Sequence, residues 1–226
     1  MTHKHEHPDI VVFGARSGVG LEFVKIAKAA GRTVVAVVRP DSEISELQAL
    51  DVVVRHADIF QPVELDRALS VVRPGWSAVS TLGRTRKEEP SVDHVGNATV
   101  IDRALVLGAA RFLFVSSLGC GDSRQFASER LLAAIGTTLQ EKTMAEEYLQ
   151  SSGLPFTIIR PGGLTSDPPS GEGALYQNPA VHGRIGRQDL AVKMWKCLQT
   201  DKTLGKIFSA VNRRHLRAPD GTVKYL

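Results

Sequence analysis

The chain has 226 residues, of which 42% are hydrophobic and 23% are charged, a composition that fits an ordinary globular domain and excludes disordered and collagen-like chains. Its net charge is +4, from 28 Lys and Arg against 24 Asp and Glu. Because these charges are spread along the chain, they do not indicate a nucleic-acid partner. No apolar run reaches the ~18 residues of a membrane span, and residues 1–8 lack the apolar segment of a signal peptide. We therefore expect a cytoplasmic protein with no membrane partner.

Short β-branched runs alternate with segments of helical spacing, a pattern typical of βαβ units in a parallel sheet. Nearly continuous apolar character in these runs indicates helices on both faces of the sheet. The sequence predicts a flexible tail over 1–8 and then a single doubly wound α/β (Rossmann) domain over 9–226, with a mostly parallel sheet of six to seven strands. The expected strands are residues 10–13, 33–38, 52–55, 78–82, 112–116, 156–159 and 207–211.

Helical spacing is clearest after the first strand, where Val19, Phe23, Ile26 and Ala30 form one apolar stripe that Gly31 closes as a left-handed cap. Two segments without periodicity, 118–127 and 161–187, are predicted as loops that contact a substrate. Further helices are predicted over 64–72, 94–108, 128–152 with an interruption near Gly136, and 189–199.

A glycine-rich loop lies between the first strand and the first helix. Glycines at this position allow a tight turn and a close approach of the backbone to a pyrophosphate, while the helix start offers free N–H groups to the anion. This context favours a dinucleotide site over a merely structural turn. The loop consists of Gly14, Ala15, Arg16, Ser17, Gly18, Val19 and Gly20.

Arg39 ends the second expected strand, at the position where an acidic residue would bind the adenosine ribose of NAD. A guanidinium suits a 2′-phosphate instead, and Arg16 offers a second cation. The sequence therefore predicts NADP (NADPH) as the cofactor. In the alternative interpretation Arg39 is a solvated charge, and Asp41 follows two residues later.

Six segments of the chain together resemble a known family: residues 11–20, 37–39, 57–59, 80–83, 115–117 and 152–164. They are similar to the atypical short-chain dehydrogenases/reductases, the group that contains NmrA-like proteins and the flavin and biliverdin-IXβ reductases. The resemblance implies that Asp58 and Ile59 flank the adenine. It also implies that the ribose side is lined by Thr81, Leu82 and Gly83, and that the nicotinamide end meets Pro161, Gly162, Gly163 and Leu164.

The catalytic tyrosine of the wider superfamily is missing. Lys142 and Glu146 resemble the family's continuation after that tyrosine, which places Thr138 where the tyrosine should stand. A threonine hydroxyl has no accessible phenolate form, and neither Tyr148 nor Tyr176 is followed by a lysine at the fourth position. An acceptor that delocalises charge, such as a flavin or a linear tetrapyrrole, needs no such acid, because water can supply the proton.

Three side chains are candidates for the catalytic end. Ser116 and Ser117 follow the fifth expected strand, where open α/β sheets bind ligands, and we expect Ser117 to contact the substrate or nicotinamide unless these serines only cap the strand. Lys142 either binds the nicotinamide ribose or is an exposed helix charge paired with Glu146. In a reductase the two loops should border an open cleft with Ser117 on its wall.

Several cations are predicted at the same edge of the sheet, where they would bind carboxylates or phosphate or would simply be solvated: Arg84, Arg86, Lys87, Arg124, His182, Arg184 and Arg187. No metal is expected, because His3, His5 and His7 stand in a short tail without fixed geometry. Cys120 and Cys197 form no CxxC pair and are predicted to be packing residues.

These patterns predict an NADPH-dependent oxidoreductase that transfers hydride to a small, conjugated and anionic aromatic acceptor such as a flavin or biliverdin. A second interpretation stays open, because NmrA-like relatives bind NADP without turnover. Loss of the tyrosine equally suits such a redox sensor, regulator or assembly factor.

Overall fold

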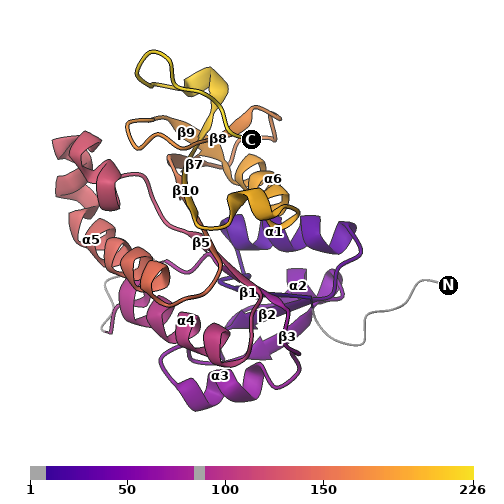
Figure 1. The fold of residues 1–226 in the computed structure, drawn as a ribbon. Helices are drawn as coiled ribbons and strands as arrows, with labels where there is room; N and C mark the ends of the chain where they lie inside the picture. Colours follow the sequence, from indigo (N-terminus) through magenta and orange to yellow (C-terminus); the bar gives the residue numbers. More distant parts are fainter. Residues whose placement is uncertain (1–8, 84–89) are drawn as a thin grey trace.

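The computed structural model describes residues 9–83 and 90–226 and confirms a Rossmann-like α/β domain. Its central sheet has eight strands in the order β3-β2-β1-β4-β5-β6-β10-β8 (Figure 1), and within the described residues only the β8–β10 pair of this sheet is antiparallel. The strands are β1 (Ile10–Phe13), β2 (Val34–Val38), β3 (Val53–His56), β4 (Ser77–Ser80), β5 (Arg111–Val115), β6 (Phe156–Pro161), β8 (Gly173–Tyr176) and β10 (Lys206–Asn212).

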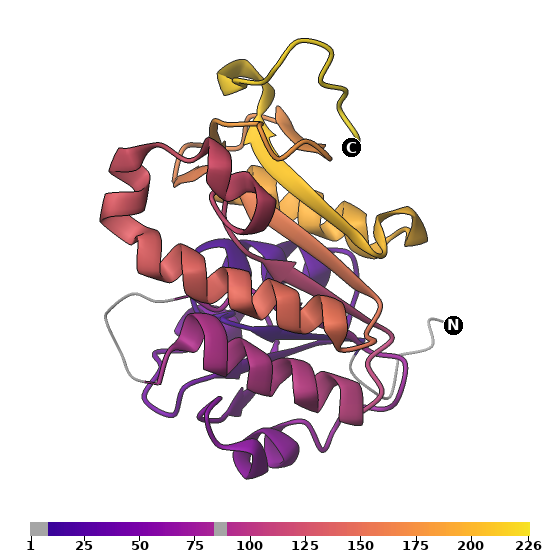
Figure 2. The same cartoon turned by 60° about the vertical axis from the view of Figure 1, so that its left-hand side comes forward.

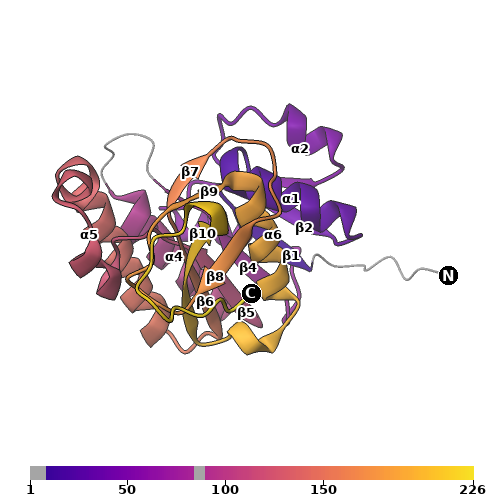
Figure 3. The ribbon, with the colours of Figure 1, turned by 90° about the horizontal axis from the view of Figure 1, so that it is seen from above.

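Helices cover both faces of this sheet. On one face α1 (Gly18–Ala29) and α6 (Arg187–Leu198) pack against alternate strand residues such as Val12 and Val34. On the other face α3 (Pro62–Ala68), α4 (Asn97–Val106) and α5 (Glu129–Ser151) pack against the residues in between, such as Val11 and Phe13. Seen from above, α4 and α5 lie on one side of the strands and α1 and α6 on the other (Figure 3). Because successive strand side chains point to opposite faces and both faces are covered, the central strands β1 and β2 are apolar throughout.

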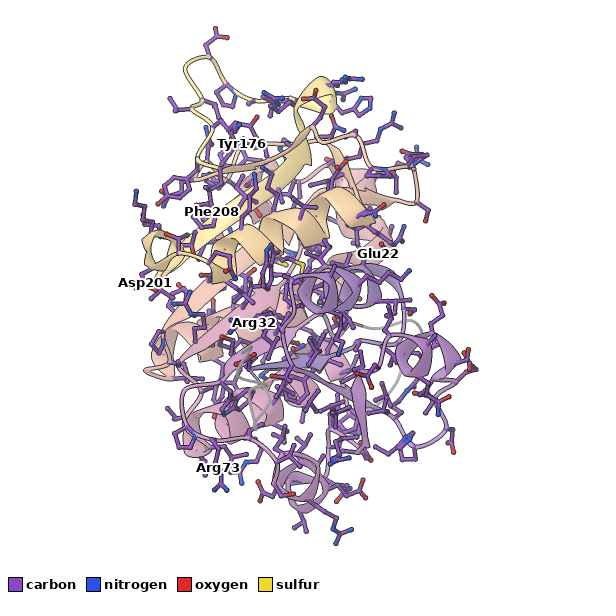
Figure 4. All side chains as sticks on the ribbon, turned by 90° about the vertical axis from the view of Figure 1, so that its right-hand side faces the viewer. Glu22, Arg32, Arg73, Tyr176, Asp201 and Phe208 are labelled. Carbon is purple, nitrogen blue, oxygen red and sulfur yellow. The ribbon has the colours of Figure 1, made fainter. Side chains whose placement is uncertain are left out.

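Two pairs of neighbouring helices form the outer layers. Figure 2 shows α4 and α5 running side by side in front of the sheet. Figure 4 shows the opposite layer, where α6 lies beside α1; Glu22 marks α1, while Tyr176 and Phe208 mark β8 and β10. Within the described residues, no helix is both long and apolar enough to cross a membrane.

The segment 161–187 differs most from the prediction, since it contains three strands instead of only loop. β7 (Gly163–Thr165) and β9 (Arg184–Gly186) form a small parallel sheet, and β8 joins β10, which raises the main sheet to eight strands. Each of these strands has only three or four residues and pairs with a distant segment. Such short strands carry no readable alternation.

Smaller differences occur elsewhere. The strand predicted to reach residue 82 ends at Ser80, and a short helix α2 (Ser45–Ala49) was not predicted. A π-helical turn η1 (Val92–Gly96) precedes α4. Short 3₁₀ turns occupy η2 (Gly121–Phe126), η3 (Asp201–Thr203) and η4 (Arg213–His215). β3 is an edge strand, and Val53 is 42% exposed, so the expectation of two covered faces is wrong there.

Other local predictions are confirmed. Gly31 has φ +76 after α1, as a left-handed cap requires. The α5 helix is interrupted by non-helical backbone at Ile135, beside the predicted break at Gly136. Cys120 and Cys197 are both buried, and burial raises the pKa of both thiols, that of Cys197 to about 12. Both therefore behave as packing residues.

Candidate active site

A cavity of about 460 Å³ lies at the carboxyl ends of the central strands. Such a size is within the usual range of small-molecule sites, and the carboxyl edge is where open α/β sheets bind ligands. Its walls come from the glycine loop, the ends of β2 and β5, the segments after β3 and β4, and single residues of α5, β7 and α6. The predicted site residues among them are Gly14, Arg16, Ser17, Gly18, Val19, Gly20, Arg39, Asp58, Ile59, Thr81, Leu82, Gly83, Ser116, Lys142 and Leu164.

The glycine loop forms a tight cradle at the start of α1. Gly14 and Gly18 have φ of +82 and +61, which favour glycine. A Cβ on Gly20 would stand 2.3 Å from the Gly14 carbonyl oxygen. The Thr81 hydroxyl donates to the carbonyl oxygens of Phe13 (3.2 Å) and Gly14 (3.1 Å), which ties the end of β4 to the turn. Only glycine therefore allows this loop to approach β4 so closely.

The first N–H groups of α1 have no side-chain cap, since Ser17 makes no cap hydrogen bond. Unsatisfied N–H groups at a helix start attract an anion. Arg187, the first residue of α6, lies beside them, with its Nε 3.8 Å from the point where a Cβ on Gly18 would stand. One of its Nη atoms donates to the Ser166 hydroxyl at 2.9 Å. This part of the cavity is thus suited to a phosphate group.

Two exposed arginines, Arg16 and Arg39, line the cavity at the end of β2 together with Ser42. The Ser42 N–H donates to the Arg39 carbonyl oxygen at 3.0 Å, so the backbone turns sharply after the strand. Asp41 and Glu43 follow β2, and the Glu43 carboxylate interacts electrostatically with Arg16, but neither acidic residue lines the cavity. The end of the cavity near β2 is therefore positively charged.

A partly apolar slot lies between the β2 end and η1, formed by Ile59, Phe60 and Val92. Asp58 stands at its edge, and its Oδ1 accepts a hydrogen bond from the Phe60 N–H at 3.0 Å. Ile59 packs against Gly96, where a Cβ would lie 2.5 Å from the Ile59 Cδ1. These contacts fix the residues on both sides of the slot.

Lys142 reaches the other end of the cavity from α5. Its Nζ donates to the Leu82 carbonyl oxygen at 3.1 Å and lies 3.0 Å from Oδ1 of Asp93, whose side chain is fully buried. The predicted alternative, an exposed lysine paired with Glu146, is wrong, because Lys142 is buried and Glu146 pairs with Arg160. The tertiary fold thus holds a lysine ammonium beside Gly83, in the cavity that Ser116 also lines.

Asp93 was not identified from the sequence, where it is one acidic residue in an aperiodic stretch. The π-helical turn brings it under Lys142, and Asn97 fixes this turn by donating to the carbonyl oxygens of Val92 and Asp93, both at 3.1 Å. Asn97 in turn accepts a hydrogen bond of 2.6 Å from the Ser80 hydroxyl. A π turn has no sequence signature that would have revealed this contact.

The two serines after β5 differ in their position relative to the cavity. Ser116 lines the cavity, and its hydroxyl lies near the Cys120 thiol without a well-formed hydrogen bond. Ser117 does not line the cavity, and its hydroxyl donates to the Leu118 carbonyl oxygen at 3.0 Å. The expected place of Ser117 on the wall is therefore taken by Ser116, because the side chains of consecutive residues here point in different directions.

The predicted loops contribute less than expected. From 161–187 only Leu164 and Arg187 line the cavity, and no residue of 118–127 does. Pro161 is buried at the end of β6, while Gly162 and Gly163 pack against the Gly183–Arg184 backbone and side chain. Ala15 is buried, and Thr138 does not line the cavity. Arg84, Arg86 and Lys87, like His3, His5 and His7, lie outside the described residues.

A family model for NAD(P)H-binding proteins matches residues 14–201. Among solved structures, the chain is similar to ChuY, an anaerobillin reductase from Escherichia coli O157:H7, with 34% identity and a TM-score of 0.83 over 90% of this chain and 97% of that one.

Curated relatives are similar over shorter stretches. A sanguinarine reductase from Eschscholzia californica is 32% identical over 122 residues, which are 52% of this chain and 44% of the relative. An uncharacterised chloroplastic protein from Arabidopsis thaliana is 32% identical over 127 residues, which are 54% of this chain and 45% of the relative. The chain thus spans about half the length of these two relatives.

Proposed function

Because the chain belongs to the NAD(P)H-binding family, we propose that it is an NADPH-dependent reductase that transfers hydride to a conjugated acceptor such as a linear tetrapyrrole or a flavin. One observation carries this proposal: a single cavity joins a glycine cradle and two arginines at one end to a buried lysine at the other. The similarity to an anaerobillin reductase supports a tetrapyrrole as the acceptor class.

The residues present fit a phosphorylated dinucleotide. In the proposed arrangement, the α1 N–H groups and Arg187 hold the pyrophosphate, and Arg16 and Arg39 hold the 2′-phosphate. The adenine occupies the slot beside Asp58 and Ile59. The glycine cradle supports this assignment, since glycines at a helix start let the backbone approach a pyrophosphate closely.

When bound, NADPH supplies the hydride. The chain itself binds and orients the two reactants at close range. In well-oriented systems such positioning lowers the activation barrier by up to ~7 to 11 kcal/mol. Lys142, fixed by Asp93 and by the Leu82 carbonyl oxygen, orients the ribose near Ser116. Leu164 supplies an apolar wall. Among the described residues that line the cavity there is no tyrosine that could donate a proton to the acceptor. The acceptor therefore takes its proton from water.

The proposal is tested by anaerobic oxidation of NADPH, followed by absorbance, with biliverdin, FMN, riboflavin and a quinone as acceptors. A reductase turns over at least one tetrapyrrole or flavin. Tight NADPH binding without turnover of any of these acceptors would instead favour the sensor or assembly-factor class.

Replacing Thr138 by alanine should leave turnover of the preferred acceptor within about threefold of the parent, under ~1 kcal/mol in the barrier. Thr138 does not line the cavity and therefore cannot serve as the acid. Steady-state kinetics measure the effect. A hundredfold loss would make Thr138 a participant and contradict proton supply by water.

Replacing Asp93 by asparagine should weaken NADPH binding about tenfold, because the amide no longer holds the Lys142 ammonium toward the ribose. Titration calorimetry measures Kd for Asp93→Asn, Lys142→Met and the double variant. If Asp93 acts through Lys142, the double variant should bind no more weakly than Lys142→Met alone. Additive losses would show that Asp93 acts independently of the lysine.

A further inference from the structure

A surface of basic and aromatic side chains lies beside the cavity, and we call it the basic ridge: Phe126, His182, Arg184, His215 and Arg217. The Phe126 and His182 rings meet edge to face, with centroids 6.5 Å apart. Arg184 Nη2 lies 3.1 Å from His215 Nε2. His182 and Arg217 exchange two backbone hydrogen bonds of 2.7 and 2.8 Å. Tertiary structure thus joins η2, β9 and the segment around η4 into one surface.

The basic ridge adjoins the wall of the cavity at Leu164. In the small sheet of β7 and β9, labelled above β10 in Figure 1, Arg184 pairs with Gly163, and the next residue of β7 is Leu164. Leu164 lines the cavity and is 38% exposed, and Phe126 on the ridge is 41% exposed. A molecule that leaves the cavity past Leu164 therefore meets both apolar surface and cations.

The charge of the ridge is not compensated. In the part of the chain that the structure describes, no carboxylate forms an ion pair with Arg184 or Arg217. By contrast, Arg213 and Arg214 in η4 share the carboxylate of Glu172. Arg217 and Arg214 stand close together in the sequence, but only Arg214 has a carboxylate partner, so Arg214 provides a matched control.

We propose that the basic ridge binds the carboxylate or phosphate substituents of the acceptor while its conjugated ring lies against Leu164 and Phe126. This inference rests on the proposed function and adds a recognition site for the acceptor. Two uncompensated arginines are too few for nucleic acid, since specific DNA-binding proteins commonly make ~6 to 10 phosphate contacts. They do suit a small dianion, because guanidinium groups bind carboxylate and phosphate strongly.

The test measures binding of matched neutral and anionic ligands to the full chain saturated with NADP⁺. Biliverdin and its dimethyl ester differ in carboxylate charge, and FMN and riboflavin differ in phosphate. Kd follows from absorbance changes for the tetrapyrroles and from fluorescence quenching for the flavins. The variants are the double replacement Arg184→Ser and Arg217→Ser, and the control Arg214→Ser, whose arginine is paired with Glu172.

We expect the double variant to bind biliverdin, FMN or both about tenfold more weakly than the parent, as two exposed charge pairs allow. The dimethyl ester and riboflavin should stay within about twofold, and Arg214→Ser should change none of the four. If the double variant loses affinity for biliverdin only, carboxylates are the natural substituents. If it loses affinity for FMN only, the natural substituent is a phosphate. Equal losses for charged and neutral ligands, or no binding of any ligand to the parent, would overturn the inference.

Salt dependence gives a second measurement that needs no variant. Raising ionic strength from ~0.01 to ~1 M shortens the Debye length from ~30 to ~3 Å and should weaken binding of the anionic ligand of each pair only. A salt-independent Kd would contradict the inference even if the double variant failed to fold. Anion-dependent binding without turnover would leave the ridge intact as a site and refute only the reductase proposal.

Discussion

Replacing Arg160 by methionine should lower the free energy of unfolding by about 3 to 5 kcal/mol, the cost of leaving a buried charge without its partner. The Arg160 side chain is 4% exposed, and Glu146, which receives its Nε and Nη2 hydrogen bonds, is 1% exposed. Burial lowers the pKa of the guanidinium, but the hydrogen bonds and charges of Glu146 and Asp122 outweigh it and raise the pKa above its ordinary value. The arginine is therefore charged at all working pH values.

Chemical denaturation measures this loss. Arg103→Met is the control, because Arg103 and Asp66 form a more exposed pair at 3.3 Å that should contribute under ~1 kcal/mol. Adding Glu146→Leu to Arg160→Met should recover part of the stability, since the unpaired carboxylate is then removed as well. A loss below ~1 kcal/mol for Arg160→Met would show that water reaches Glu146 and that the pair is not a buried one.

Replacing Arg39 by alanine should weaken NADPH binding by about 2 to 3 kcal/mol, roughly 30- to 150-fold, and leave NADH binding nearly unchanged. The reason is that Arg39 and Arg16 line the cavity at the end of β2, where the 2′-phosphate is proposed to lie, and NADH has no such phosphate. Titration calorimetry with both cofactors gives the ratio of the two Kd values.

Arg187→Ala supplies the matched control for cofactor choice. Arg187 lies beside Gly18, next to the proposed pyrophosphate position that both cofactors share. Its loss should therefore weaken NADPH and NADH by the same factor. Equal parental affinities for the two cofactors, or a preference that survives Arg39→Ala, would refute the role proposed for Arg39.

The positions of the central strands along the chain and the position of the glycine loop could be predicted from local sequence. Buried parallel strands are continuous apolar runs, and a helix such as α1 repeats its apolar residues within a few positions, so both signals lie inside one short window. Gly14, Gly18 and Gly20 were readable for the same reason, because a strand directly precedes them and a helix directly follows.

The contacts that complete the cavity were decided only by the tertiary structure. Asp93 reaches Lys142 because a π-helical turn packs under α5, and Arg187 reaches Gly18 because α6 lies beside α1. The strands β7, β8 and β9 exist because distant segments pair with them. The energy of such contacts comes from residues far apart in the chain, so no local pattern of the sequence encodes them.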